Sequence, residues 1–441
     1  MAELSVLLKD SPLGEFWLPG QDKRQVPGVI VERGGVLQLE LMEPLVEESD
    51  SSTQNKPDFY PVICGWLSKG GPVTLFNCPS GRNENIPGNE WERCSFAYAI
   101  QGQPLENTDA FLFNKANVQL AGLVDWTGLN GLAERWDEDT TIHGGRTWTA
   151  SYALPEPRVY QVDSDLTIKL LATCRWSSVG RFGMQILQDV AMEIALDDAV
   201  SFAELESKVH GIRQLLMLLA GLELRPTWNH VGHVSDEEAL TVFRNQTSRP
   251  STEPAHPQLH TFVPFEDISA ELPELLSRWV GVQKSYGDAV ATGLFTPYLS
   301  HTYETKISNL VNCLVRYAEA DAGGEKALKQ EVRSQKGGVA AYVVEKTVRR
   351  YRPTARDDFL SDLKEKIEAT RHYYTHFNPD KKEIAAEGAE LANLVDFLDV
   401  MNHCVLLEKL GLERDRIIQW VHKSHEYGRR FRMERFQEFD S

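Results

Sequence analysis

Apolar and polar residues alternate through much of the chain between residue 14 and about residue 200, which is typical of half-buried β-strands. One hairpin is predicted where residues 29–31 and 36–41 flank a Gly-containing turn. The other strand-like runs are residues 60–67, 73–77, 95–100, 110–113, 118–123, 147–152, 166–174 and 183–187. Because these runs are short and are separated by Gly, Pro and Asn, they predict a β-sandwich or a partly open barrel.

A change of period at residue 201 predicts a helix that ends near residue 220. Ser201 and Glu204 have the spacing of a capping box, in which the serine hydroxyl accepts from a backbone N–H of the first turn. An apolar stripe follows at residues 202, 205, 209, 212, 216 and 219. Gly221 and Pro226 then end the helix.

Residues 227–268 carry a mixed pattern with many His and Pro and only weak strand signals. His230 and His233 form an HxxH pair that lacks both a helical context and an acidic third ligand, so we interpret them as polar loop residues. From residue 269 the period is helical to the end of the chain. The predicted helices are residues 272–282, 305–320, 337–351, 357–377, 383–410 and 414–422. Several helices with short connections predict an up-and-down bundle.

These patterns predict an α+β protein of more than one domain. Residues 1–268 are expected to form a β-rich domain, sandwich-like or barrel-like, that also contains the helix at residues 201–220. Residues 269–441 are expected to form an all-α helical bundle. A length of 441 residues agrees with about two or three domains.

The chain is acidic, with 46 Lys and Arg against 64 Asp and Glu and a net charge of −18. Residues 301–441 carry 24 basic and 24 acidic side chains, so the whole acidic excess lies in residues 1–300. Since binding to phosphate requires clustered cations, this balance argues against a generic nucleic-acid coat. Any surface for a polyanion is expected in the last third of the chain.

The six cysteines are widely spaced and form no CxxC pair, which indicates reduced thiols in a cytoplasmic protein. A zinc site at Cys64, Cys78 and Cys94 stays open as an alternative, although their spacing matches no familiar ligand pattern. The N-terminus lacks the pattern of a signal peptide, and no run of 18 apolar residues occurs. We therefore expect no membrane span.

The segment richest in candidate chemistry is RHYYTHFNP at residues 371–379, where Asn378 and Pro379 are expected to end the preceding helix. Arg371 and His376 are five positions apart, about 140° around a regular helix axis, but a fraying last turn can direct both to one side. The helix dipole favours a charged histidine at this end, which suits proton exchange near neutral pH.

Arg371, four intervening residues and His376 resemble the RX4–6H signature of HEPN domains. The longer run RHYYTHFNP, preceded by LKEKIEAT, is similar to that of ApeA-type HEPN proteins of bacterial anti-phage defence. Residues 14–19, 34–41 and 72–78 resemble the β-rich domain of that family, so the resemblance spans about residues 12–430. Two positions depart from the family pattern: His372 stands where Asn is common, and Val315 where many relatives carry Glu.

The resemblance implies a metal-independent endoribonuclease with no cofactor, whose active site forms across a homodimer with Arg371 and His376 from each subunit. RNA cleavage requires deprotonation of the 2′-OH and protonation of the 5′-oxygen, and His376 can serve as general base or acid. Arg371 can bind phosphate bidentately and stabilise the transition state. One histidine cannot easily be base and acid in one step, and a two-fold dimer supplies the second.

A magnesium-dependent nuclease would instead require clustered carboxylates. The nearest acidic pair, Asp357 and Asp358, has the position of an ordinary helix N-terminus. No metal ligands are therefore assigned.

Four residues beside the pair are assigned supporting or RNA-binding roles: His372, Tyr373, Tyr374 and Asn378. His372 would orient the pair or touch the phosphate. The two tyrosines would stack on a splayed base, although Tyr374 is explained equally well as a core residue.

Two basic clusters could line an RNA groove. The first contains Arg349, Arg350 and Arg352 together with Lys346 and Arg356, and the second contains Arg429, Arg430, Arg432 and Arg435. Solvation of these residues, or pairing with the acidic N-terminal domain, explains them equally well.

The function expected from the resemblance is a restrained toxic ribonuclease of abortive infection. A phage protein would be the trigger, the β-rich domain the sensor and regulator, and structured RNA, with tRNA anticodon loops as one candidate, the substrate. Dimers or higher oligomers are expected. The alternative is a non-catalytic HEPN module for dimerisation or RNA binding, with the function in a ligand-sensing β-domain. A weaker alternative is the toxin of a nucleotidyl- or AMP-transferring partner system.

Overall fold

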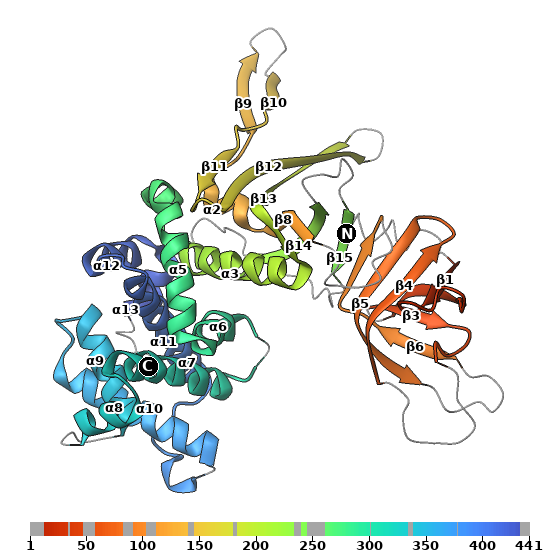
Figure 1. Cartoon of the computed structure of the whole chain (residues 1–441). Coiled ribbons are helices and arrows are strands. Elements are labelled where there is room, and N and C mark those ends of the chain that lie inside the picture. Colours follow the sequence, from red (N-terminus) through yellow and green to blue (C-terminus); the bar gives the residue numbers. More distant parts are fainter. Residues whose placement is uncertain are drawn as a thin grey trace, which may run out of the picture. The chain divides into compact units, whose positions relative to one another are not determined.

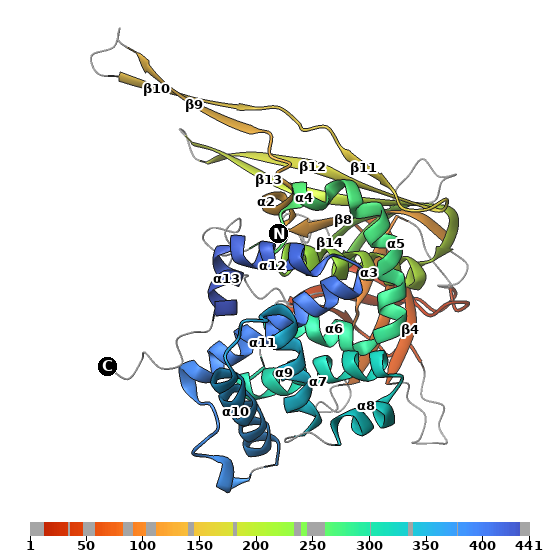
Figure 2. The same ribbon diagram turned by 90° about the vertical axis from the view of Figure 1, so that its left-hand side faces the viewer.

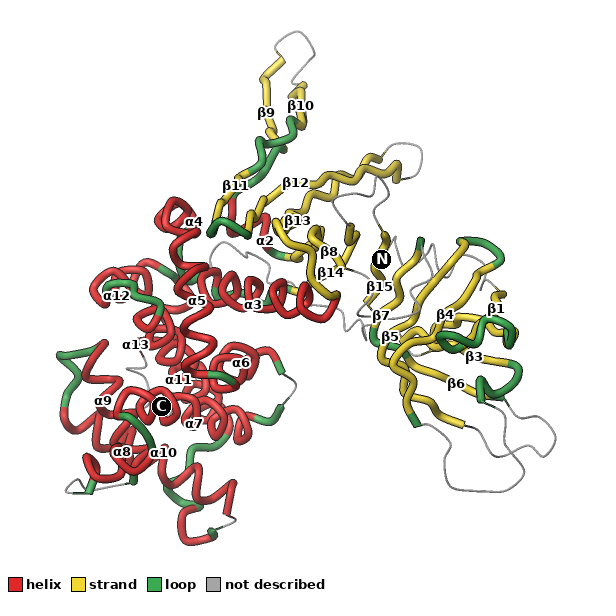
Figure 3. Tube along the Cα trace, viewed as in Figure 1, coloured by secondary structure: helices red, strands yellow, loops and turns green. Residues whose placement is uncertain are grey.

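The computed structural model describes residues 13–33, 36–46, 58–82, 91–102, 112–139, 145–179, 183–232, 240–244, 261–299, 301–333, 338–376 and 378–432. The chain forms two compact units (Figure 1). The β-rich unit comprises residues 1–124, 129–209 and 225–253, and the helical unit comprises residues 125–128, 210–224 and 254–441. Strands precede a helical C-terminal region, as Figure 3 shows, so the predicted α+β fold class is confirmed.

Six N-terminal strands close into a barrel. They are β1 (Leu13–Trp17), β2 (Val26–Arg33), β3 (Val36–Leu41), β4 (Phe59–Leu67), β5 (Gly71–Arg82) and β6 (Glu92–Ser95). The antiparallel order is β5–β4–β1–β2–β3–β6, and β6 returns to β5, where Cys94 lies opposite Ser80. Because side chains alternate along each strand, one face supplies an apolar interior that contains the fully buried Phe16, Ile30 and Leu39.

The sheet continues from β5 into an open part. Its strands are β7 (Tyr98–Gln101), β8 (Leu112–Ala121), β11 (Arg158–Gln161), β12 (Leu166–Val179), β13 (Gly183–Ser201), β14 (Arg225–Gly232) and β15 (Leu240–Arg244). They follow β5 in the order β7–β15–β14–β8–β13–β12–β11, all antiparallel. Strands β9 (Leu132–Asp139) and β10 (Gly145–Tyr152) form a separate two-stranded ribbon. Strand β5 therefore pairs both within the barrel and with the open part.

Helix α3 (Phe202–Ala220) confirms the helix predicted over residues 201–220. Its first turn is capped as predicted, because the Ser201 hydroxyl accepts a hydrogen bond from the Glu204 backbone N–H at 3.3 Å. Gly221 ends it with φ +69°, a left-handed conformation that favours glycine. A short helix, α2 (Leu123–Thr127), lies between β8 and β9.

The helical unit contains a bundle around α11 (Gly388–Lys409). Its other helices are α4 (Phe265–Ile268), α5 (Leu272–Tyr286), α6 (Asp288–Phe295), α7 (Tyr303–Ala322), α8 (Glu325–Val332), α9 (Val339–Tyr351), α10 (Asp357–His376), α12 (Arg414–Lys423) and α13 (His425–Arg432). Helices α6, α7, α9, α12 and α13 all contact α11, and α10 packs against α7 and α9 (Figure 2). Residues along α11 such as Leu394, Leu398 and Met401 are fully buried, as expected for the central helix of a bundle.

The predicted hairpin is the β2–β3 pair, with Arg33 opposite Val36. Two predictions about strand limits are wrong. The strand predicted over residues 95–100 is divided into β6 and β7, because the chain shifts along β5 at this point: β6 pairs around Ser80 and β7 pairs at Val73–Phe76. The strands predicted over 110–113 and 118–123 are one strand, β8.

The helix predicted over residues 383–410 begins later than expected, at Gly388. Residues Pro379–Lys381 form a 3-10 turn, η4, and Glu387 is extended with φ −132° and ψ 157°. Gly388 itself has φ +56°. The apolar Ile384 extends the helical period into this segment, but the turn after α10 uses these residues to reverse the chain.

We keep the division of the chain at residue 268 as a proposal about functional domains. Compact packing assigns residues 210–224, at the end of α3, to the helical unit.

Candidate active site

Helix α10 carries most of the predicted site residues at its C-terminal end. Asp357 and Asp358 open the helix, where their charges favour the positive end of the helix dipole. Leu360, Leu363 and Ile367 are buried at helical spacing, so one face of α10 packs into the bundle. The opposite end therefore presents Arg371 and its neighbours from a packed helix.

Arg371 is held by a residue of α7. Its guanidinium Nη2 donates a hydrogen bond to Asn312 Oδ1 at 3.0 Å. Its Nε is buried with no hydrogen-bond partner among the described residues. Burial lowers the pKa of Arg371, whereas the nearby Glu368 acts to raise it. The guanidinium is thus half-buried and oriented by a neutral acceptor.

Helices α7 and α10 are antiparallel neighbours at this site. One helical turn from the Arg371–Asn312 contact, the hydroxyls of Ser308 and Thr375 lie 3.4 Å apart. Ser308, Asn312 and Val315 have the i, i+4, i+7 spacing of one helix face. Val315, where the family pattern favours Glu, therefore lies on the face of α7 that turns toward α10.

Asn312 is a contact that the sequence analysis missed. The signal available in the sequence was a polar residue within the apolar stripe of α7, beside the buried Val311 and Cys313. That signal gave no partner, because periodicity describes one helix at a time and the pairing of two helices requires the bundle.

His376 is the last residue of α10, and its side chain lies outside the part of the chain that the structure describes. His372 is exposed one turn earlier, and its backbone carbonyl accepts from the Asn378 N–H at 3.4 Å. Arg371 and His376 thus belong to the same helix end, and the distance between their functional atoms is not a described quantity.

Tyr373 and Tyr374 contact each other edge to face, with ring centroids 4.7 Å apart. The Tyr374 hydroxyl lies 3.5 Å from the Ala386 carbonyl, and burial raises the pKa of Tyr374, with Glu387 and Glu304 acting in the same direction. Both rings are half-buried. Tyr374 therefore helps to pack the segment that follows α10.

The same segment is anchored at two further points. The buried Thr370 hydroxyl accepts from the Ala386 N–H at 2.9 Å. The Asn378 side chain caps η4 by accepting from the Asp380 N–H at 3.1 Å. Asn378 thus has a local structural contact, in addition to its proposed supporting role.

Arg349, Arg350 and Arg352 lie at the other end of α10. Arg349 bonds to Asp357, the first residue of that helix, at 2.8 Å. Asp357 is 14 residues from Arg371, which corresponds to about 21 Å along a helix axis. The structure therefore does not gather these arginines with Arg371.

All three arginines already have partners in the helical unit. Arg349 also pairs with Glu345 at 3.0 Å. Arg350 makes a two-pronged contact with Glu408, one bond of which measures 2.6 Å. Arg352 donates to the Phe431 carbonyl at 3.1 Å and stacks over the Phe431 and Phe359 rings.

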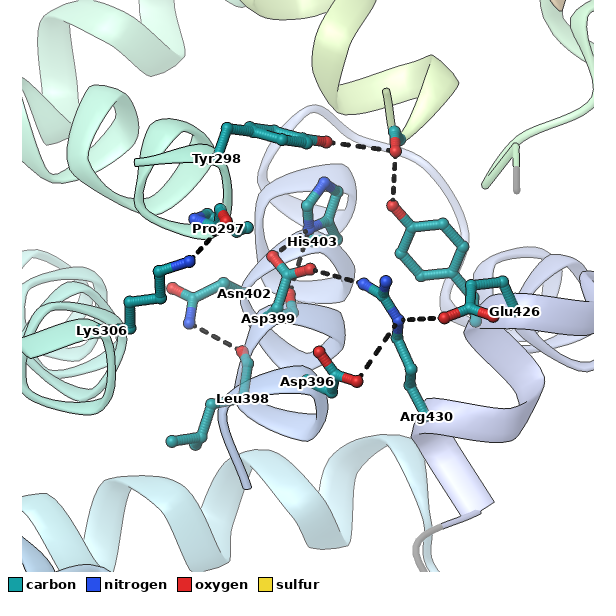
Figure 4. Close-up of polar contacts among 12 residues, drawn as sticks. Pro297, Tyr298, Lys306, Asp396, Leu398, Asp399, Asn402, His403, Glu426 and Arg430 are labelled. Carbon is teal, nitrogen blue, oxygen red and sulfur yellow. Dashed lines mark hydrogen bonds and ion pairs between the residues drawn. The ribbon is translucent and has the colours of Figure 1, made fainter. Parts of the chain in front are cut away.

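The second basic cluster also pairs within the helical unit. Arg430 lies 3.3 Å from Asp399 and 2.8 Å from Glu426, and Arg429 lies 2.7 Å from Glu426 (Figure 4). Arg432 donates to the Gly428 carbonyl, and Arg435 lies outside the described residues. Much of the positive charge on this element is thus opposed by carboxylates.

The remaining candidates provide no ligand set in the described structure. Cys64, Cys78 and Cys94 are buried, and burial raises the pKa of Cys94 to about 12. Among the described residues, no group of three His, Cys, Asp or Glu side chains is arranged to hold a metal ion. His230 lies on β14, and His233 is outside the described residues. No helix in the described ranges is long and apolar enough to cross a membrane.

Two family models match the chain. The model of ApeA N-terminal domain 1 matches residues 12–279, and the model of the Apea-like HEPN domain matches residues 301–416. The chain belongs to the ApeA family. It is an ApeA-type HEPN anti-phage protein, so the resemblance inferred from RHYYTHFNP is confirmed. Comparisons with curated proteins and with solved structures found no match.

The HEPN match includes α7, α9, α10 and most of α11, and therefore both Arg371 and Asn312. HEPN domains are generally RNase-like, and they commonly dimerise and bind RNA. The helical unit of this ApeA protein is accordingly a defence-related, nuclease-type module.

Proposed function

We propose that this ApeA protein is a metal-independent endoribonuclease of abortive infection that cleaves host RNA with Arg371 and His376. The observation that carries the proposal is the half-buried guanidinium of Arg371, which bonds to the neutral Asn312 within the HEPN match. Arg349 and Arg350, in contrast, are opposed by carboxylates. Arg371 therefore keeps an unneutralised positive charge for a phosphate.

In the proposed reaction His376 removes the proton from the 2′-OH, which then attacks the adjacent phosphorus atom. Arg371 stabilises the charge that develops on the phosphoryl oxygens. The 5′-oxygen leaves with a proton from a second His376, supplied by the other subunit of a homodimer. The products are a 2′,3′-cyclic phosphate and a free 5′-hydroxyl.

Three further roles complete the proposal. His372, Tyr373 and Tyr374 contact the RNA beside the cleaved bond, with the tyrosines stacking on an unpaired base. Arg349, Arg350 and Arg352 contact phosphates farther along the strand, exchanging their present partners for RNA. The β-rich unit senses a phage protein in the cytoplasm and releases the nuclease.

The test is cleavage of total RNA, including tRNA, by the purified full-length chain in the presence of EDTA. We expect fragments with 2′,3′-cyclic phosphate ends, and loss of this cleavage by a factor of about 100 or more in Arg371→Ala and His376→Ala. The same substitutions should relieve toxicity on overexpression.

The matched controls are Arg356→Ala, an exposed arginine at the other end of α10, and His425→Ala, an exposed histidine at the start of α13. Both should cleave at the wild-type rate. Activity abolished by EDTA would contradict the metal-independent mechanism. Full biological activity in both active-site variants would favour the non-catalytic alternative.

A further inference from the structure

Asn312 is the one hydrogen-bond acceptor for the Arg371 guanidinium among the described residues. It reaches Arg371 from α7, whereas Arg371 lies on α10, so the contact fixes the guanidinium relative to a second helix. An arginine side chain has several rotatable bonds, and ordering it before substrate binds reduces the entropy that binding must remove. A contact of this kind can therefore contribute to the rate.

The chemistry of the acceptor matters because an amide oxygen carries no net charge. A carboxylate in the same place would form an ion pair with Arg371 and compete with the phosphate for its donors. The neighbouring pairs Arg349–Glu345 and Arg350–Glu408 show the arrangement that Asn312 avoids.

The state of the other donors agrees with a prepared guanidinium. Nη2 is bound to Asn312, and Nε is buried without a partner, so the edge that includes Nη1 is the part left for a ligand. Leaving a buried N–H unpaired costs roughly 1–3 kcal/mol, so this orientation is held by the surrounding helices and not by Arg371 alone.

We infer that Asn312 is a positioning residue, which orients the Arg371 guanidinium for the phosphate without neutralising it. This inference rests on the proposed function. It adds a polar residue of α7 to the site, on the same helix face as Val315.

The experiment measures RNA cleavage and, separately, the chemical reactivity of Arg371. Asn312→Leu removes the acceptor at similar size, and Asn312→Asp keeps an oxygen but adds charge. We expect kcat to fall about 10- to 100-fold in Asn312→Leu, because the guanidinium is displaced. In Asn312→Asp we expect a raised KM for RNA, because the new carboxylate competes with phosphate.

Two comparisons separate positioning from a general effect on the fold. Ser308→Ala removes the other α7–α10 contact and should leave cleavage unchanged. The double variant Asn312→Leu with Arg371→Ala should be no slower than Arg371→Ala alone, since Asn312 acts through Arg371. Additive losses in the double variant, or an equal loss in Ser308→Ala, would overturn the inference.

Labelling with phenylglyoxal, followed by mass spectrometry of the peptide that contains Arg371, provides a readout that does not depend on nuclease activity. Asn312→Leu should increase the labelling rate of Arg371 several-fold, whereas Ser308→Ala should not change it. Unchanged labelling in Asn312→Leu would refute the positioning role. Increased labelling in a protein that cleaves no RNA would instead refute the proposed function and leave the positioning role standing.

Discussion

Nδ1 of His403 lies 3.2 Å from Oδ1 of Asp399, and both side chains are buried in the helical unit (Figure 4). The same nitrogen lies 3.1 Å from the Asp399 carbonyl, and the imidazole stacks on Phe262. Burial acts to lower the pKa of His403, but the Asp399 carboxylate outweighs it, and the pKa is raised above its ordinary value. A charged histidine is thus accommodated inside the bundle.

This pair predicts that stability falls as the pH rises. Because the pKa of His403 is raised in the folded state, its contribution is fully present below about pH 6.5, the ordinary value for an unfolded chain, and is lost through the folded-state pKa. Denaturant unfolding at several pH values should show this loss. His403→Gln should remove it, whereas the exposed His425→Gln should keep it.

Glu426 predicts a second pH effect, of opposite sign. Burial would raise its pKa, but hydrogen bonds from Arg429 and Arg430 lower the pKa to about 2. The stabilisation is therefore present above about pH 4.5 and is lost as the pH falls toward 2. Thermal unfolding of Glu426→Gln should show a weaker dependence on pH in this acid range. An unchanged acid dependence would mean that other carboxylates control it.

Gly221 should tolerate no side chain. Its φ of +69° disfavours other residues, and a Cβ would collide with the Tyr427 hydroxyl, which donates to the Gly221 carbonyl at 2.8 Å. Gly323 has a similar φ of +83° but open space around it. Gly323→Ala should cost about 1–2 kcal/mol of unfolding free energy for its backbone conformation alone. Gly221→Ala should cost clearly more; equal losses would show that Tyr427 moves aside.

Thr370→Val should loosen the segment that follows α10. The substitution keeps the shape of the side chain but leaves the buried Ala386 N–H without its acceptor, a loss of about 1–3 kcal/mol. Hydrogen exchange at the Ala386 amide should become faster, while exchange in α11 should be little affected. Thr375→Val, which alters an exposed contact with Ser308, is the control and should leave the Ala386 amide protected.

The sequence predicted elements better than it predicted their partners. The apolar stripe beginning at Phe202 gave α3 nearly to the residue, because capping and periodicity are local properties. The closure of the barrel between Ser80 and Cys94 depends on pairing far along the chain, which local pattern does not contain. The same limit applies to the site: RHYYTHFNP identified the helix end that carries Arg371, but not the acceptor on α7 that holds it.

The basic clusters show a second limit. Counting arginines near residue 350 predicted a surface for RNA, yet the partners of those arginines are far away in sequence: Glu408 for Arg350, and the Phe431 carbonyl for Arg352. Charge composition gives the number of cations, whereas the folded chain decides how many stay unopposed.

Strand β5 links the barrel to the rest of its unit, because Val73–Phe76 pairs with β7 while Ser80–Arg82 pairs with β6. A fragment that ended before β7 would expose one side of β5 as a row of unpaired amides and carbonyls, a template for intermolecular association. The barrel is therefore a poor candidate for excision as an autonomous module, and truncations for biochemical work should keep β5 and β7 together.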